Sequence, residues 1–231
     1  MSYLWQEFNI KTFPAETLVF RDGVFRPELS EYESAEINHE KNLISVQKTS
    51  KLPVHIIYIG EIAGKTDLNI DINCEKSRVF MTCKIFNKKP AFLNIFIKNT
   101  GKKSVFDGKI IAKNTDILKI NEIGQHLSSN TGIFLKNHII SYKGSETELK
   151  GCTKIENNLS DCDSDISFSV LADKDSKIIM QPTQYIKSIP FAASHSASLY
   201  KPTDNQITYL KMSGLSDSEI KQIMEDAFTE I

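Results

Sequence analysis

The sequence has no clear excess of charge of either sign and no long apolar run. Its 231 residues contain 28 Lys and Arg against 29 Asp and Glu, for a formal net charge of -1. This balance gives no electrostatic reason to expect nucleic acid or an anionic membrane as a partner. No apolar run approaches the roughly 20 residues of a membrane-spanning helix, and the start, MSYLWQEFNIKTF, lacks the basic and apolar segments of a signal peptide. We therefore expect a cytoplasmic protein.

Metal-binding and nucleotide-binding signatures are also missing. The four cysteines form no C-x-x-C pair and have no histidines at zinc-finger spacing, which argues against a structural zinc site; they are Cys74, Cys83, Cys152 and Cys162. In a cytosolic protein we expect them to be reduced thiols. No G-x-x-x-x-G-K-[ST] phosphate loop is present, so we expect no nucleotide bound by this chain.

Four of the five histidines are scattered among polar or β-prone segments. None lies two or four residues from another candidate ligand, and we expect structural or surface roles for His39, His55, His126 and His138. His195 differs because it stands among small residues in the stretch SHSAS, just before two helical patterns.

A succession of short β-prone runs extends from Val54 to about Ile189, each bounded by Gly, Asn, Asp, Ser or Lys. Apolar and polar residues tend to alternate, as at Leu68, Ile70 and Ile72, which indicates strands with one buried face. A sandwich, a barrel and a β-helix all fit this pattern. The scarcity of tight hairpin signals over so long a region favours the β-helix.

The N-terminal segment has a different pattern. In LVFRDGVF, the pair Asp22-Gly23 lies between two apolar runs and predicts a type I′ hairpin. Residues 28–50 are polar and acidic, and we expect a surface connection or a short helix there.

Two short helices are predicted at the C-terminal end. Thr203 with Gln206 and Ser216 with Glu219 have the spacing of capping boxes, and Gly214 can take the left-handed conformation that ends the first helix. The second helix has an apolar face at i, i+3, i+4 spacing, made of Ile220, Ile223, Met224, Ala227, Phe228 and Ile231. The pattern leaves open whether this face packs on the body of the domain or in a groove of another protein.

The same C-terminal region carries a family resemblance. Three groups of residues are spaced as in the C-terminal signature of the SufB/SufD family of iron–sulfur cluster assembly scaffold proteins: Ser194-His195-x-Ala197-Ser198, Asp204-x-Gln206-Ile207-x-Tyr209-Leu210, and Ser213-Gly214-Leu215. LVFRDGVF, KLPVHIIYIG and IIMQPTQYI are similar to further segments of that family. The chain is short for the family and resembles a reduced, minimal-length member.

The resemblance implies a right-handed parallel β-helix in three parts. These are an N-terminal hairpin and connecting segment (1–53), a β-helix core (54–199) and a C-terminal helical ATPase-docking element (200–231). It also implies a non-enzymatic scaffold that binds a SufC-like ABC-type ATPase and pairs with a second scaffold chain, as a homodimer or with a related subunit. The docking residues it implies are Gln206, Ile207, Tyr209, Leu210, Gly214, Leu215, Ile220 and Met224.

The resemblance further implies a transient iron–sulfur cluster with His195 as a ligand. Imidazole and thiolate are suitable iron ligands, and Cys152 and Cys162 could join His195 if the fold brings them near it. Two departures from the family pattern favour an alternative: Ser196 replaces the glutamate ligand, and the strand ISFSVLAD has no thiol. The alternative is a purely structural D-type subunit without a cluster.

Two hypotheses outside the family stay open. A β-helix carbohydrate-active enzyme would need carboxylates gathered on one coil face, and the only dense acidic cluster is Asp161, Asp163 and Asp165, which a solvated turn explains better. An unrelated β-rich binding module would leave the C-terminal match unexplained.

Overall fold

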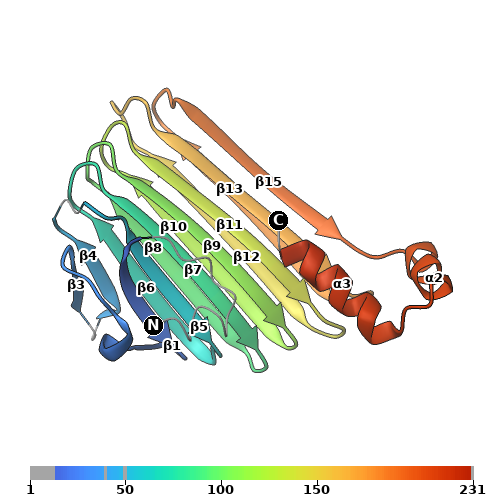
Figure 1. Cartoon of the computed structure of the whole chain (residues 1–231). Coiled ribbons are helices and arrows are strands. Elements are labelled where there is room, and N and C mark those ends of the chain that lie inside the picture. The colour runs from blue at the N-terminus through green and yellow to red at the C-terminus, as the bar shows by residue number, and fades with distance from the viewer. Residues whose placement is uncertain (1–13, 39–40, 49–50, 230–231) are drawn as a thin grey trace.

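The computed structural model describes residues 14–38, 41–48 and 51–229. They form a β-solenoid of about 6 turns, preceded by a short N-terminal segment and followed by two helices (Figure 1). The parallel β-helix predicted from the sequence is therefore confirmed.

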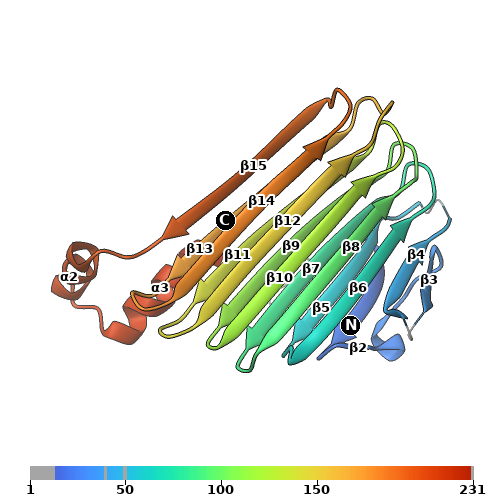
Figure 2. The same ribbon diagram turned by 180° about the vertical axis from the view of Figure 1, so that it is seen from behind.

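Two sheets make up the solenoid, and the chain alternates between them. The eight-stranded sheet has the order β15 (Ala192–Tyr200), β13 (Asp163–Ala172), β11 (Gly132–Ser141), β9 (Val105–Asn114), β7 (Arg78–Asn87), β5 (Val54–Gly60), β1 (Glu16–Arg21) and β2 (Val24–Phe25). The seven-stranded sheet has the order β14 (Lys177–Ile186), β12 (Glu146–Ile155), β10 (Ile117–His126), β8 (Ala91–Asn99), β6 (Gly64–Ile72), β4 (Leu43–Val46) and β3 (Ala35–Asn38) (Figure 2).

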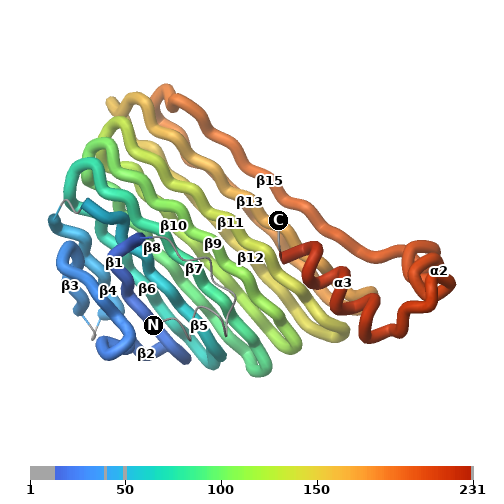
Figure 3. Tube along the Cα trace, in the orientation of Figure 1, coloured from blue at the N-terminus to red at the C-terminus, as the bar shows by residue number. Residues whose placement is uncertain are grey.

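Neighbouring strands within each sheet are parallel, apart from the antiparallel pairs β1–β2 and β3–β4. From β4 and β5 onward, equivalent positions on successive coils are 25 to 31 residues apart, as the register pairs Val54 with Val79 and Glu146 with Lys177 show. The tube in Figure 3 shows the resulting stack of similar coils.

The apolar residues that alternate along the strands face the core between the two sheets, and the polar residues between them face outward. On β9, Phe106, Ile110 and Ala112 are buried between the sheets, while Asp107 and Lys109 point outward. Because side chains alternate between the two faces of a strand, residues in register on neighbouring strands form rows, and the inward rows make one continuous apolar core.

The turns between coils repeat as well. Lys76, Lys103 and Asn130 occupy equivalent turn positions in the left-handed region, with φ of 58°, 60° and 60°. Asn87 and Asn114 close the ends of β7 and β9, and the Asn87 side chain donates to the Asn114 side chain over 2.9 Å. Buried polar groups at the coil ends are thus paired from coil to coil.

One ionisable group lies inside the core. Glu122 on β10 is 0% exposed, and the Asn137 side chain on the facing strand β11 donates to its Oε2 over 2.5 Å. Burial raises the pKa of Glu122 to about 7, opposed by the Asn137 hydrogen bond. The Cys83 thiol is also buried, and burial followed by the charge of Glu122 raises its pKa.

The N-terminal hairpin is confirmed, and the segment after it contributes more than a connection. Asp22 and Gly23 have φ of 51° and 79°, as a type I′ turn requires, and β1 and β2 pair across it. Residues 28–50 were expected to be a surface connection or a short helix; they contain the end of the 3-10 helix η1 (Pro27–Leu29) and the strands β3 and β4. The two sheets therefore begin before Val54.

Candidate functional site at the C-terminal end

The solenoid is open at its C-terminal end. β15 and β14 are the last strands of the two sheets, and no further described strand pairs with either of them. Their outer edges therefore present unpaired backbone groups, which are ready templates for another chain.

His195 lies on the core-facing row of β15. It is in register with Ile166 of β13, which is 0% exposed, whereas His195 itself is exposed because no coil stacks on it. Its neighbours Ser194 and Ser196 point to the outer face, where they donate hydrogen bonds to Asp165 and Ser167. The small residues around His195 thus belong to an uncovered end of the core.

Gln184 ties the two sheets together at this end. Its side-chain nitrogen on β14 donates to the Ser194 carbonyl over 2.8 Å and to the Ser164 carbonyl over 3.2 Å. In the coil below, the equivalent residue Thr153 also takes part in a polar contact between the sheets, because it accepts a hydrogen bond from Ser164 over 2.6 Å.

Large apolar side chains are exposed around the same opening. Ile189 is 88% exposed, Phe191 is 77% exposed and Tyr185 is 57% exposed. They lie on β14 and on the turn between β14 and β15. Exposed large apolar groups near an open sheet edge are typical of protein–protein contact surfaces.

The two cysteines considered as metal ligands lie apart from His195. Cys162 is buried in the turn before β13, within 3.6 Å of both Thr131 Oγ1 and the Ser128 carbonyl. Its backbone oxygen accepts from Phe191, four residues before His195, which places it roughly 13 Å from the histidine along the strand. Cys152 lies on the outer face of the seven-stranded sheet, because its neighbours Gly151 and Thr153 are buried.

These placements do not assemble a metal site around His195. Among residues 14–38, 41–48 and 51–229, no group of three or more His, Cys, Asp and Glu side chains could hold a metal ion. The acidic residues Asp163 and Asp165 lie on the outer face at the start of β13, after Asp161 in a left-handed turn with φ of 56°.

The helix boundaries follow the predicted caps. α2 (Asp204–Met212) begins with a complete capping box between Thr203 and Gln206. α3 (Asp217–Thr229) follows Ser216, whose backbone nitrogen donates to Glu219 over 2.8 Å while its hydroxyl accepts from the Glu219 backbone. Gly214 lies between them with φ of 88°.

α3 lies on the outer face of the eight-stranded sheet, against β11 (Figure 1). The Phe228 ring packs edge-on against His138 and Tyr200, each with 5.7 Å between ring centroids. Glu225, only 5% exposed, bonds to Lys113 over 2.6 Å and accepts from the Tyr142 hydroxyl over 2.7 Å. Burial, and then the contact with Glu225, raises the pKa of Tyr142.

The apolar face of the second helix is only partly used by these contacts. Ile220 and Phe228 are buried and Met224 is half-buried, but Ile223 is 46% exposed and Ala227 is exposed. Ile231 lies outside the described residues, as does His39.

α2 projects beyond the solenoid and contacts α3 (Figure 3), and its first residue, Asp204, forms an ion pair over 2.7 Å with Lys174 in the turn after β13. It has no buried residue: Tyr209 is 71% exposed and Met212 is 84% exposed, while Ile207, Leu210 and the following Leu215 are half-buried. Gln206 is occupied in the cap. Most of the predicted docking residues thus lie together on one helical element, and Tyr209 is the exposed aromatic among them.

A cleft of about 210 Å³ separates this element from the solenoid. Ile140, Leu171, Ile207, Ile220 and Met224 supply its apolar lining, and Asp173, Asp217 and Glu225 lie among its polar groups. Lys221 also lines the cleft, and Asp217 and Glu225 are each paired with a lysine, so its border carries charges of both signs.

Sequence reasoning missed three residues of this region. Glu225 and Gln184 carry the contacts that fix α3 and close the last coil, and Phe191 is the exposed aromatic at the opening. Of the three, only Glu225 could have been found from the sequence, because it is a charged residue next to the apolar face of the second helix. Pairing of Gln184 with Ser194 depends on the coil register, which the sequence does not specify.

Comparison of the chain with models of known protein families and with curated proteins finds no match. None of the helices in the described part of the chain combines the length and apolar character needed to cross a bilayer.

Proposed function

We propose that this chain is a scaffold subunit of a SUF-like iron–sulfur cluster assembly complex. The observation that carries the proposal is the placement of the C-terminal signature. His195 lies at the uncovered end of a parallel β-solenoid, and Tyr209 lies exposed on the helical element that follows. An enzyme of the carbohydrate-active class gains no such support from Asp163 and Asp165, which lie on an outer strand face.

In this proposal the helical element docks a SufC-like ABC-type ATPase. Tyr209 and Met212 offer a large exposed apolar and aromatic surface, and aromatic residues are common energetic anchors of interfaces. The adjoining cleft can receive an apolar side chain of the partner. ATP hydrolysis belongs to the partner.

The open end pairs with another scaffold chain, either a second copy or a related subunit. Unpaired edges on β14 and β15 can accept strands, and Phe191 and Ile189 supply apolar contact area. His195 would then lie at the junction between the two chains. Nucleotide-driven movement of the ATPase subunits would pull on the helices and shear this junction.

A second candidate function inside the same complex is a structural subunit that holds no cluster. The separation of Cys152 and Cys162 from His195 favours it, because a cluster ligated by this chain alone would lack thiolates. A cluster at the junction therefore needs ligands from the partner chain, with His195 as this chain's contribution.

Anaerobic co-purification with the SufC-type ATPase, followed by absorption spectroscopy and iron and sulfide analysis, tests the proposal. We expect a stoichiometric complex that holds iron and sulfide, and a His195→Ala variant that keeps the ATPase but loses most of the iron. A complex with the ATPase but without iron in either form would support the structural subunit. Absence of any complex would overturn both.

A further inference from the structure

Exposed basic residues gather along one edge of the solenoid, on the turns that lead into β5, β7 and β9. Residues 47–53, 73–78 and 100–104 contain one acid, Glu75, and six exposed basic residues, which are Lys48, Lys51, Lys76, Arg78, Lys102 and Lys103. We call these six residues the basic ridge. The turns of successive coils stack along this edge, as Figure 3 shows. Positive charge is thus concentrated there in a protein whose formal net charge is -1.

Three lysines of the basic ridge form a column at the spacing of the coils. Each stands three residues before a position that is in register with its neighbours: Lys51 before Val54, Lys76 before Val79, and Lys103 before Phe106. The Lys76 backbone nitrogen donates to the Lys102 carbonyl over 2.9 Å, so these two turns are in direct contact. Backbones on neighbouring coils are about 4.8 Å apart, and like charges opposite one another at this spacing are destabilising.

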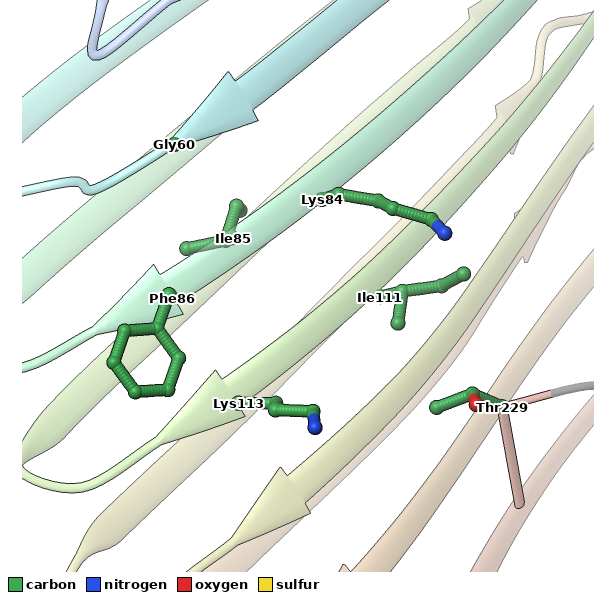
Figure 4. A pocket seen from close by; sticks show the side chains of 7 residues that line it. All are labelled: Gly60, Lys84, Ile85, Phe86, Ile111, Lys113 and Thr229. Carbon is green, nitrogen blue, oxygen red and sulfur yellow. The ribbon is translucent and has the colours of Figure 1, made fainter. Parts of the chain in front are cut away.

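Within the described residues, no member of the basic ridge forms an ion pair. Lysines elsewhere on the same coils do have acidic partners. Lys113 borders a cavity of about 210 Å³ at the end of α3 (Figure 4) and bonds to Glu225 over 2.6 Å, and Lys88 bonds to Glu61 over 3.0 Å. The basic ridge therefore keeps its positive charge available for a partner.

The conformation of these turns does not require lysine. Lys76 and Lys103 have φ of 58° and 60°, in the left-handed region, which costs free energy for most residues with a side chain. Asn and Asp tolerate this region better, and they occupy the equivalent positions of the next two coils as Asn130 and Asp161. The two lysines thus combine backbone strain with charge repulsion, and such local costs are typical of residues that serve a function.

The geometry of the column fits an acidic segment of a partner protein. Its repeat of about 4.8 Å is close to the roughly 5–6 Å between side chains four residues apart on a helix. Nucleic-acid bases stack on aromatic side chains, but the exposed Phe86 and Phe92 lie at the opposite edge, around the turn from β7 to β8. We propose that the basic ridge binds a protein segment that carries Asp or Glu at i, i+4 spacing.

The basic ridge is separate from the helical element of the proposed function. It lies where β5, β7 and β9 begin, whereas α2 follows the end of β15 (Figure 1). Because the strands of this sheet that follow β5 are parallel, α2 lies at the opposite edge of the solenoid. Binding of an acidic segment to the basic ridge therefore does not depend on the ATPase.

A labelled alanine-based helical peptide with glutamates at i, i+4 and i+8 is the probe, and fluorescence anisotropy measures its binding at physiological salt. Lys76→Glu/Lys103→Glu should weaken binding about tenfold or more, because like charges across an interface are strongly unfavourable. Lys136→Glu/Lys201→Glu is the matched control, since it makes the same change in net charge at two exposed lysines away from the basic ridge. Screening by salt should keep its effect below about twofold.

Lys76→Asn/Lys103→Asn provides a second measurement. Both changes introduce the residue type of the next coil, remove the repulsion and ease the backbone strain. The variant should therefore unfold at a higher temperature than wild type while it binds the probe more weakly. An equal or lower unfolding midpoint would mean that the two lysines serve the fold, and would overturn the proposal.

Other results would also overturn it. No binding of the probe at physiological salt, or equal weakening in the two charge-reversal variants, would leave the basic ridge a solvated surface. Tighter binding of a single-stranded oligonucleotide or of phosphatidylserine vesicles, lost in Lys76→Glu/Lys103→Glu, would assign it to a nucleic acid or a membrane. Salt-sensitive self-association that this variant loses would assign it to an acidic turn of a second copy.

Discussion

Asn137 and Glu122 join the two sheets of the solenoid by a 2.5 Å hydrogen bond inside the apolar core. Among the described residues, the remaining side-chain oxygens, Glu122 Oε1 and Asn137 Oδ1, have no hydrogen-bond partner, and burial raises the pKa of Glu122 to about 7. A protonated Glu122 is therefore the form that the core accepts at neutral pH and below.

The substitution Glu122→Gln should remove a pH-dependent loss of stability. The folded pKa of about 7 exceeds the usual 4.5, so the wild-type core is fully stable below pH 4.5 and loses stability as pH rises through 7. At about 1.4 kcal/mol per unit, the Glu122→Gln variant should gain about 3 kcal/mol relative to wild type between pH 4.5 and 8. Urea unfolding of both proteins across this range measures the difference.

The difference in unfolding free energy between wild type and Glu122→Gln, taken at each pH, removes the contribution of the other titrating groups. Burial lowers the pKa of His55 and His126 to about 4, so these groups destabilise both proteins equally as pH falls from 6.5. Glu148→Gln is a control on the outer face, where hydrogen bonds from Lys150 and Lys119 lower the carboxyl pKa, and its pH trend should have the opposite sign. A pH-independent difference for Glu122→Gln would contradict the account.

Glu225→Ala should release α3 from the sheet while the solenoid stays folded. The change leaves the Tyr142 hydroxyl and the Lys113 ammonium without their acceptor, at a cost of about 2 kcal/mol. Hydrogen exchange should then show faster exchange confined to α3. Asp226→Ala changes the neighbouring exposed acid and should alter exchange little; equal effects of the two variants, or faster exchange throughout the solenoid, would refute the anchoring role.

Phe191→Asp should prevent pairing at the open end. Phe191 is 77% exposed, so the folded chain should lose little stability, while a charge in an apolar contact is strongly unfavourable. We expect wild type to sediment as a dimer at micromolar concentration and the variant as a monomer. Val24→Asp, at a 53% exposed site on β2, should remain dimeric; a monomeric wild type would contradict self-pairing and leave a related subunit as the partner.

The features that could be predicted from the sequence depend on local chemistry. Asp22-Gly23 specifies its hairpin because few residues tolerate two positive φ angles in succession. Thr203 and Gln206 specify a helix start because their side chains satisfy backbone groups within one turn. Alternation without hairpin signals favours the β-helix but fits a sandwich or a barrel as well, and the family resemblance points to the β-helix.

The features that could not be predicted depend on register between distant coils. Which residue is in register with His195, how far Cys162 lies from it, and whether Asn137 meets Glu122 are all set by coil lengths of 25 to 31 residues. A shift of one residue would exchange the inner and outer faces.

Calorimetric titration of the SufC-type ATPase into this protein, compared with its Tyr209→Ala variant, tests the central claim most directly. Tyr209 is 71% exposed on α2, so its truncation should leave the unfolding midpoint almost unchanged. Loss of a central interface anchor costs on the order of 2 kcal/mol, so binding should weaken about thirtyfold. Thr208→Ala, an exposed neighbour on the same helix, should bind as wild type does. Equal affinity of the ATPase for wild type and Tyr209→Ala, or no binding to wild type, would contradict docking through these helices.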